Sequence, residues 1–286
     1  MQLLAKPRKA RTMTASTLIE RPEGGSPAAN ADVSYTIASL INDRVHYAAM
    51  LASFRAGGFM DADCEYLFID NSLENRACAY RGLDAMLSAA RGEAVILCHQ
   101  DVRLLSDDRQ TLDARLAGLS ARDSDWALAG NAGAMAPGHL ALRITDPHGA
   151  DQNTAPLPAR VMSLDENFIV VRRAARIGFS RNLSGFHFYG ADICLNAAMA
   201  GYSTYVIDFH LAHLSAGNKS EAFFDAQEAF RKKWNAALSP RWMQTTCALV
   251  RLSGDRVGQM AGRVATRPLA ALHRRLVSSV GARRDT

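Results

Sequence analysis

The order of apolar and polar positions predicts three successive units of a strand followed by a helix. Val33 to Ile41 is a β-branched apolar run, and it stops at Asn42 and Asp43, which are good capping residues for a helix over Val45 to Arg55. The runs EYLFID and AVILC, the latter ending at Cys98, repeat this pattern. Strands that are apolar on both faces and alternate with helices indicate a parallel sheet covered on both sides, so the predicted fold class is α/β.

Residues with polar side chains mark the point where each of these strands stops. They are Asn42, Asp70, Asn71, His99, Gln100 and Asp101. Ligands of open α/β sheets bind outside the carboxyl ends of the strands, where all six residues fall. The sequence therefore predicts a binding site at this edge of the sheet.

The second half of the chain continues with strands and helices. Strands are expected at WALAGN, within MSLDENFIVVRR and at STYVID. Helices are expected from Tyr189 to Ala200, ended by Gly201, and over SEAFFDAQEAFRKKW. The stretch from Ala132 to Pro158 is too long for an ordinary connection, so we expect a loop that covers substrate.

The two ends of the chain differ in composition from its middle. Residues 1–32 combine basic residues with proline, glycine and serine, so we expect a disordered tail. Residues 33–238 are the expected catalytic domain, and residues 239–286 form a basic, partly helical tail. A helix over Pro268 to Val280 would carry an apolar stripe beside arginines. That stripe fits shallow insertion at an anionic membrane surface and, equally, packing on the catalytic domain or a second subunit.

Composition excludes several classes of protein. The chain has 286 residues, of which 48% are hydrophobic, which suffices for one good-sized core. It contains neither a membrane-spanning apolar stretch nor the apolar core of a signal peptide, so we expect a cytoplasmic protein, with the tail allowing peripheral contact at the inner face of the membrane. The net charge of +5 is uneven, because the tail from Arg241 to Thr286 holds nine arginines against two aspartates, and no nucleic-acid partner is expected. The five cysteines lack CxxC spacing and are expected to be reduced.

The acidic residues at the ends of the strands suit phosphate and nucleoside chemistry. Asp101 could hold a Mg²⁺ or Mn²⁺ ion that bridges a diphosphate, because both cations accept oxygen ligands. Asp70 could accept hydrogen bonds from a ribose or a base. A solvated loop aspartate and a helix N-cap are the alternative interpretations of these two positions.

A second group of candidate residues lies between Gly185 and Gly217. Asp192 is near the start of a helix, where the dipole favours its ionised form, so it could accept a proton or simply compensate the dipole. His210 and His213 follow a strand, and a neutral imidazole is a good ligand for Mn²⁺, although a single histidine is more often structural.

Several segments, in order and spacing, resemble family-2-like glycosyltransferases of the GT-A-type fold. They are FIDNS, AYRGL, HQDV, FHFYGAD with the CL, A and GY that follow it, and HLS. The chain is similar to the subgroup that carries HQD or HDD in place of the usual DxD. The resemblance covers Val33 to Trp234, about 70% of the chain, and implies a mostly parallel sheet flanked by helices.

The resemblance assigns roles to several residues. Asp101 matches the last aspartate of the metal motif, His99 stands in place of its first aspartate, and His213 matches the late histidine of the metal site. Asp70 matches the carboxylate that holds the nucleoside, and its strand-end neighbours Asn42, Asn71 and Gln100 are expected to bind the nucleotide sugar with it.

The position of the general base is less well defined by the resemblance. Asp192 matches an acidic position of the block that supplies the base. Gly190 and Ala191 stand where relatives often carry another acidic residue, so Asp165 and Glu166 are kept as further candidates for the base. The chain also departs from the pattern at Arg81, where an asparagine is common.

The function that the resemblance implies is inverting transfer of a sugar from a UDP- or GDP-sugar to a hydroxyl group, assisted by Mn²⁺ or Mg²⁺. The acceptor would be a glycan or a lipid-linked glycan. The alternative from another class is a catalytically weak nucleotide-sugar-binding or scaffold protein, which the departures at Gly190 and Arg81 favour. A nucleotidyltransferase fits less well, because no glycine-rich loop with a lysine follows the first strand.

Overall fold

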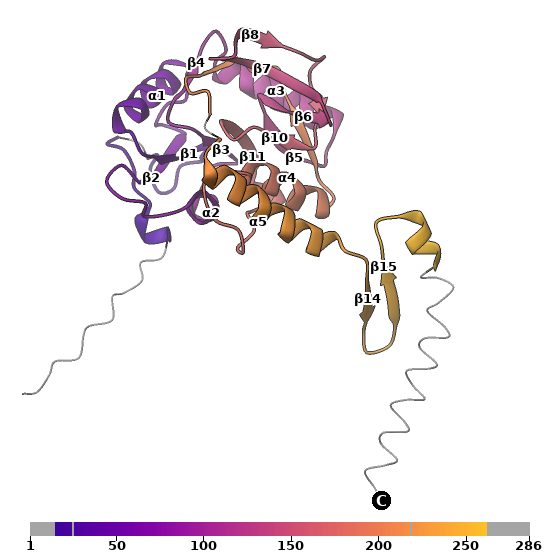
Figure 1. Cartoon of the computed structure of the whole chain (residues 1–286). Helices are drawn as coiled ribbons and strands as arrows, with labels where there is room; N and C mark the ends of the chain where they lie inside the picture. Colours follow the sequence, from indigo (N-terminus) through magenta and orange to yellow (C-terminus); the bar gives the residue numbers. More distant parts are fainter. Residues whose placement is uncertain (1–14, 25, 218, 262–286) are drawn as a thin grey trace, which may run out of the picture. The chain divides into compact units, whose positions relative to one another are not determined.

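The main sheet has seven strands in this computed structural model, which describes residues 15–24, 26–217 and 219–261 (Figure 1). The strands are, in order across the sheet, β2 (Cys64–Asp70), β1 (Tyr35–Ile41), β3 (Ala94–Cys98), β11 (Phe168–Arg172), β5 (Trp126–Gly130), β12 (Ser203–Val206) and β9 (Ala159–Arg160). β1 is parallel to β2 and β3, and β5 is parallel to β12. β11 runs antiparallel to both β3 and β5, and β9 runs antiparallel to β12.

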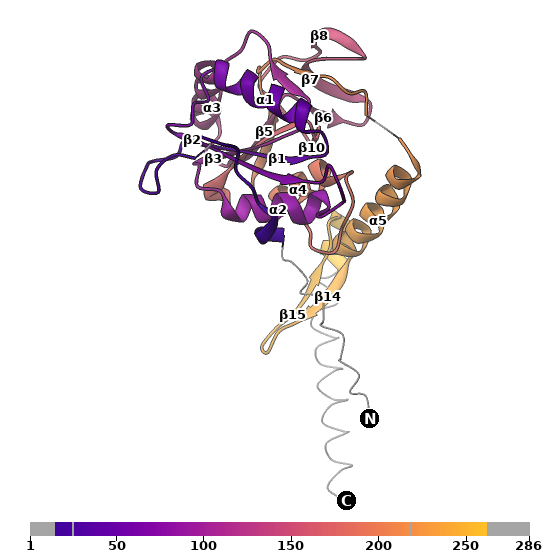
Figure 2. The same ribbon diagram turned by 90° about the vertical axis from the view of Figure 1, so that its left-hand side faces the viewer.

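Helices cover both faces of this sheet. Figure 2 shows α1 (Arg44–Ala56) and α3 (Arg109–Arg122) on one side, and α2 (Ala79–Ala89) and α4 (Tyr189–Met199) on the other. On the first side, Ile37 of β1 belongs to one buried cluster with Phe54 of α1 and Leu112 of α3. Because each face must be buried, the strands are apolar at successive positions. The predicted α/β class is confirmed.

The segment 132–158, which the sequence predicted as a long loop, instead contributes three strands to a second sheet. Its strand order is β10 (Ser163–Leu164), β6 (Ala132–Ala136), β7 (His139–Asp146), β13 (Leu211–His213) and β4 (Val102–Leu104), and β8 (Gly149–Asn153) pairs with β7. Gly138, with φ of 77°, makes the turn between β6 and β7. The carboxylate of Asp146 accepts hydrogen bonds from the backbone N–H groups of His148 and Gly149 and so closes the next turn.

The helix that follows β2 begins later than the apolar pattern predicts. Leu73, which was expected on its buried face, is 94% exposed, and α2 starts only at Ala79. The side chain of Asn71 explains the delay: its amide donates to the Ala77 carbonyl oxygen and accepts from the Arg76 and Ala77 N–H groups. These bonds hold the segment between strand and helix as a turn.

The described residues before position 33 contact β2 and Arg91, whereas composition predicted disorder up to residue 32. The short helix η1 (Ala15–Leu18) buries Leu18, and Glu20 exchanges two backbone hydrogen bonds with Phe68 at the edge of β2. Arg91 binds the carbonyl oxygens of Pro27 and Ala28. Specific polar contacts thus hold a segment that has little apolar surface to bury.

The chain divides into two compact units, Met1–Gln227 and Glu228–Thr286, and the predicted boundaries at 32 and 238 remain predictions. α5 (Glu221–Leu238) contains the division. The second unit also holds an antiparallel hairpin of β14 (Arg241–Gln244) and β15 (Leu249–Leu252). The predicted helix over residues 268–280 lies outside the described residues. Within the described ranges, no helix combines the length and apolar character needed to cross a membrane.

Candidate active site

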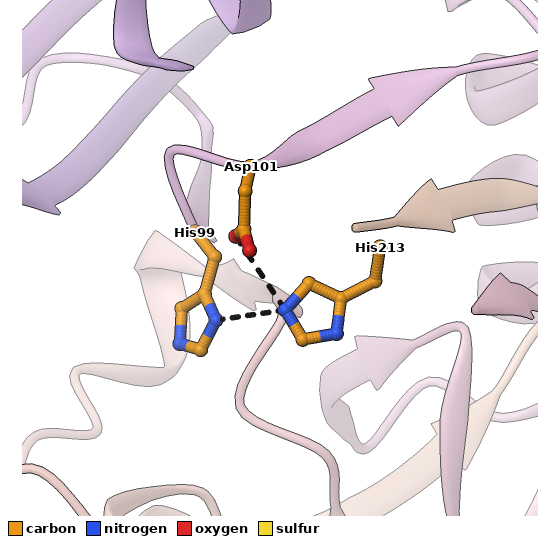
Figure 3. A group of neighbouring side chains, drawn as sticks. All are labelled: His99, Asp101 and His213. Atoms are coloured by element: carbon orange, nitrogen blue, oxygen red, sulfur yellow. Dashed lines mark hydrogen bonds and ion pairs between the residues drawn. The ribbon is translucent and has the colours of Figure 1, made fainter. Parts of the chain in front are cut away.

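Three residues come together beyond the carboxyl end of β3, and Figure 3 shows them: His99, Asp101 and His213. His99 and Asp101 lie in the short turn between β3 and β4. His213 ends β13, which pairs with β4 so that His213 stands opposite Val102. The Nε2 atom of His213 is 3.5 Å from Oδ1 of Asp101 and 3.3 Å from Nδ1 of His99.

The three side chains fit a divalent metal ion. One ligand atom from each lies within 4.8 Å of the others. Ligand atoms that are neighbours around an octahedral ion lie about 3 Å apart, which is close to the separations of 3.3 and 3.5 Å at His213. The cluster supplies three donors, so an ion there would keep positions open for oxygen atoms of a diphosphate. The sequence prediction named the same three residues.

Tyr189, a residue the sequence did not predict for the site, orients His99. Its hydroxyl donates to the backbone carbonyl oxygen of Glu166 at 3.2 Å and lies 2.7 Å from Nε2 of His99. The imidazole therefore donates from Nε2 to the tyrosine, and its Nδ1 atom keeps the lone pair that a metal needs. Fixing a histidine tautomer through its second nitrogen is a common feature of metal sites.

Charge is balanced within the cluster. Burial alone would raise the pKa of Asp101, but its hydrogen bond and attraction to His213 outweigh burial and hold that pKa far below the usual range. Burial would lower the pKa of His213, and the same interaction with Asp101 raises it instead. Burial and the neighbouring His213 lower the pKa of His99, which favours its neutral form.

A pocket of about 580 Å³ adjoins the cluster. Its lining includes His99, Gln100 and Asp101 from the turn between β3 and β4, and Asn42 and Asn71 from the ends of β1 and β2. Its other lining residues, besides Glu166, are Leu40, Ile41, Asn75, Ala79, Leu83, Leu97, Cys98, Phe186, Tyr189 and Ser215. Five of them belong to the motifs quoted above, namely Ala79 and Leu83 to AYRGL, Phe186 and Tyr189 to FHFYGAD, and Ser215 to HLS. The other five belong to none of those motifs.

The four residues predicted to bind the nucleotide sugar, Asn42, Asp70, Asn71 and Gln100, all have side-chain contacts within the protein. The side-chain oxygen of Gln100 accepts from the backbone N–H groups of Asn42 and Asp43, at 2.8 and 2.9 Å. The side-chain amide of Gln100 donates to the side-chain oxygen of Asn42. Gln100 thus connects the turn between β3 and β4 to the start of α1, where Asp43 caps the helix.

Asp70 also has internal partners. Its carboxylate accepts from Nε of Arg44 and from the Ser72 N–H group, both at 2.7 Å, and Asp70 does not line the pocket. Burial would raise its pKa, but these bonds hold it below the usual value. The nucleotide-binding role of Asp70 stays a prediction.

Asp192, the predicted general base, is fully buried and does not line the pocket. Its carboxylate accepts from the N–H and hydroxyl groups of Ser180, both at 2.8 Å, and from the amide of Asn196 at 3.3 Å. These contacts join the segment before α4 to the helix itself. His210 is likewise engaged elsewhere, since Thr145 lies 2.9 Å from its Nε2 atom.

Glu166, one of the further candidates for the base, lines the pocket. It precedes β11, and because β11 is antiparallel to β3, the start of β11 lies beside the end of β3, where His99 follows. The His99 N–H group donates to the Asn167 carbonyl oxygen at 2.9 Å. Burial raises the pKa of Glu166 to about 8, although the Gly190 N–H group donates to its carboxylate at 3.1 Å. Asp165, the other candidate, is exposed.

Comparison with solved structures gives distant likenesses, and no protein-family model matches the chain. The TarS 1–349 fragment of S. aureus, solved with UDP-GlcNAc, has a TM-score of 0.49 and 13% identity over 70% of this chain and 65% of that one. The mannosyltransferase PcManGT of Pyrobaculum calidifontis, solved with GDP-Man and Mn²⁺, has a TM-score of 0.43 and 15% identity over 69% and 61%. The chain spans less than two thirds of either protein, and at these TM-scores the function must be argued from the site itself.

A sequence relative is much closer to the chain. It is the protein named ATP synthase subunits region ORF 6 of Fuscovulum blasticum, which is 33% identical over 226 residues. The aligned region covers 77% of this chain and 91% of the relative. That name states no activity. Identity at this level over most of both proteins shows common membership, and the chain belongs to the family of ATP synthase subunits region ORF 6.

Proposed function

We propose that the chain is an inverting glycosyltransferase that moves a sugar from a UDP- or GDP-sugar to a hydroxyl group with the help of a divalent metal. One observation carries the proposal: His99, Asp101 and His213 form a metal-ligand cluster beside a 580 Å³ pocket, at the carboxyl ends of the strands. Sites in this position of an α/β sheet bind nucleotides. The ordered motifs that resemble family-2-like glycosyltransferases support the same function.

The cluster favours Mn²⁺ over Mg²⁺. Mg²⁺ prefers oxygen ligands and keeps much of its water, whereas Mn²⁺ also accepts imidazole nitrogen, and two of the three donors here are imidazoles. When bound, the ion neutralises charge on the diphosphate leaving group. Asp101 would supply the negative charge that holds the ion, His99 would supply a neutral donor, and His213 would do so once the ion displaced its proton.

The pocket beside the cluster suits a nucleoside. Its lining combines aliphatic side chains such as Leu40 and Leu83 with the asparagines Asn42, Asn71 and Asn75. Apolar walls can cover the faces of a base, and a small number of amides can orient its edges and the ribose hydroxyls. The neutral amides select neither uracil nor guanine, in agreement with a donor defined only as a UDP- or GDP-sugar.

The acceptor in this proposal is a hydroxyl group of a glycan or of a lipid-linked glycan. A carboxylate removes the hydroxyl proton while the hydroxyl oxygen attacks the anomeric carbon from the face opposite the diphosphate. One displacement inverts the anomeric configuration. The basic segment from Arg241 onward provides peripheral contact with an anionic membrane surface, where such acceptors lie.

A second candidate function is binding of a nucleotide sugar without transfer. Gly190 favours it, because this position carries no acidic side chain next to the pocket. The two functions differ in one measurement: a binding protein holds nucleotide and Mn²⁺ with no turnover of any donor.

Calorimetry with UDP and GDP, with and without Mn²⁺, tests the proposal, followed by a hydrolysis screen of UDP- and GDP-linked hexoses. We expect Mn²⁺-dependent binding and slow hydrolysis of one donor by the wild type. Asp101→Asn and His213→Ala should each weaken Mn²⁺-dependent binding by more than about 10²-fold with an unchanged melting temperature. His139→Ala, an exposed histidine of β7, serves as the matched control and should bind as the wild type does. Equal Mn²⁺ dependence in the wild type and Asp101→Asn would remove the metal site.

A further inference from the structure

We infer that Glu166, and not Asp192, is the general base that takes the proton from the acceptor hydroxyl. This assignment rests on the proposed glycosyl transfer. It gives a catalytic role to a residue on the connection between β10 and β11 that contacts Gly190 at the start of α4.

Access to the pocket separates the acidic residues. Among the described residues that line the pocket, Asp101 and Glu166 are the carboxylates. Asp101 belongs to the metal cluster, where His213 is its partner. Glu166 is therefore the pocket carboxylate that has no metal-binding role to fill.

The packing around Gly190 explains why the carboxylate comes from residue 166. A Cβ atom at position 190 would lie 2.6 Å from the backbone carbonyl oxygen of Leu164 and 3.0 Å from Cγ of Glu166. The first distance is shorter than any ordinary contact and involves backbone, so no side chain fits at 190 without displacing β10. The Glu166 side chain instead lies against Gly190, whose N–H group donates to its Oε1 atom at 3.1 Å.

Glu166 is also connected to the metal cluster. Its backbone carbonyl accepts from the hydroxyl of Tyr189, the same hydroxyl that receives a hydrogen bond from His99. Glu166 and the residues that would hold the metal ion thus belong to one hydrogen-bonded framework at one pocket. In the transfer step the acceptor O–H proton goes to the Glu166 carboxylate, the acceptor oxygen bonds to the anomeric carbon, and the bond from that carbon to the diphosphate breaks with its electron pair on the diphosphate.

The surroundings of the carboxylate suit it to this role. Burial and the negative charge of Asp165 raise the pKa of Glu166 to about 8, and the Gly190 N–H group opposes them. The phenols of Tyr80 and Tyr189 also face it, and burial keeps the pKa of each high, so both remain neutral. His99 and Asp101 line the same pocket. A base whose pKa lies near the working pH is effective, because it is both available and strong.

Asp192, in contrast, has a structural position. It is 0% exposed, and Ser180 and Asn196 occupy its two oxygen atoms. An acceptor hydroxyl could reach it only after these bonds broke and the segment from Gly178 to Leu183 moved. Its contacts hold that segment, including Phe179, against α4.

The test compares Glu166→Gln with Asp192→Asn in the full chain. The amide of Glu166→Gln still accepts from the Gly190 N–H group but cannot take a proton. We expect donor turnover to fall by about 10² to 10⁴-fold, while the affinity for UDP or GDP in Mn²⁺ stays within about threefold of wild type. Wild-type turnover should rise with pH towards about 8, and this rise should be absent in Glu166→Gln. Asp192→Asn should keep turnover within about threefold and lose thermal stability.

Rescue keeps the assignment testable if Glu166→Gln folds poorly. Added formate should restore part of the turnover of Glu166→Ala, since a small carboxylate can enter the space left by the side chain, and it should not change Asp192→Asn. If the wild type turns over donor and Glu166→Gln does so at a near-normal rate, the assignment of Glu166 is overturned. A lack of formate rescue in Glu166→Ala overturns it as well. In both cases the proposed function still stands. Absence of nucleotide binding in the wild type overturns the proposed function and this inference with it.

Discussion

The carboxyl group of Glu166 links the stability of the first unit to pH. Its pKa is about 8 in the fold, against an ordinary value of 4.5, so between these values the native state keeps a proton that the unfolded chain has lost. The stabilisation is complete below about pH 4.5 and is lost as the pH rises through 8. We expect Glu166→Gln to gain stability relative to wild type over this window, on the order of 3 kcal/mol, measured by urea unfolding at pH 5, 7 and 8.5.

Glu74→Gln is the control for this prediction, because Glu74 is an exposed glutamate in the turn before α2. Its unfolding free energy should follow the wild-type pH dependence. A constant difference between Glu166→Gln and wild type at all three pH values would show that the carboxyl of Glu166 titrates normally.

The sequence could predict the three residues of the cluster but could not distinguish the candidate bases. His99 and Asp101 directly follow a recognisable buried strand, so their place at the sheet edge follows from topology. The sequence positions of Asp192 and Glu166 do not show which carboxylate reaches the pocket, because that access depends on tertiary packing. The contacts of Ser180 with Asp192, and of Leu164 with Gly190, bring together residues 12 or more positions apart.

At the scale of elements, the β14–β15 hairpin presents an apolar face. Register places Met243 opposite Val250 and Arg241 opposite Leu252, and the three apolar side chains are exposed. On the other face, the guanidinium of Arg251 lies over the ring of Trp242, 5.5 Å from its centroid. Apolar side chains with arginines beside them suit an anionic lipid surface.

We expect the triple variant Met243→Ser, Val250→Ser, Leu252→Ser to lose most of the binding to vesicles that contain phosphatidylglycerol. Sedimentation with these vesicles, at low and high salt, measures the loss. Leu73→Ser is the matched control, because Leu73 is an exposed apolar residue of the first unit, and it should sediment as the wild type does. Equal sedimentation of the triple variant and wild type would assign the apolar face to another partner.

The success of element prediction depended on how strongly each segment is buried. β1, β2 and β3 are almost fully buried, and their unbroken apolar runs identified them. Two residues of β7 and none of β8 are buried, so their mixed composition resembled a loop. The long loop was therefore a wrong prediction for residues 132–158, and the late start of α2 was missed because it depends on the side chain of Asn71.

At the scale of the whole first unit, one buried carboxylate holds the N-terminal segment on the sheet. Glu65 of β2 is 0% exposed and binds Arg91 at 3.2 Å and Arg21 at 3.3 Å, while Thr36 donates to its second oxygen. Arg91 also holds the Pro27 carbonyl oxygen. Arg91→Ala leaves Glu65 buried with one cation, so we expect a loss of about 3 kcal/mol in the free energy of unfolding.

Chemical unfolding of Arg91→Ala measures this loss, and limited proteolysis should show faster cleavage before residue 33. Arg181→Ala, at an exposed arginine, is the control and should unfold as the wild type does. If Arg91→Ala and Arg181→Ala unfold alike, the segment is held by Leu18 and the bridge to Phe68 instead.

The antiparallel direction of β11 has a mechanical consequence for the whole unit. Phe168 pairs with Cys98, and the next rung joins the N–H group of His99 to the carbonyl of Asn167. The ion that would hold the leaving group and the carboxylate that would take the proton are thus spaced by a single rung of backbone. The pairing of β11 with β3 therefore fixes how far apart the two groups lie. An acceptor would have to fit that gap, so selection among hydroxyl groups would begin with the sheet, before any loop closes.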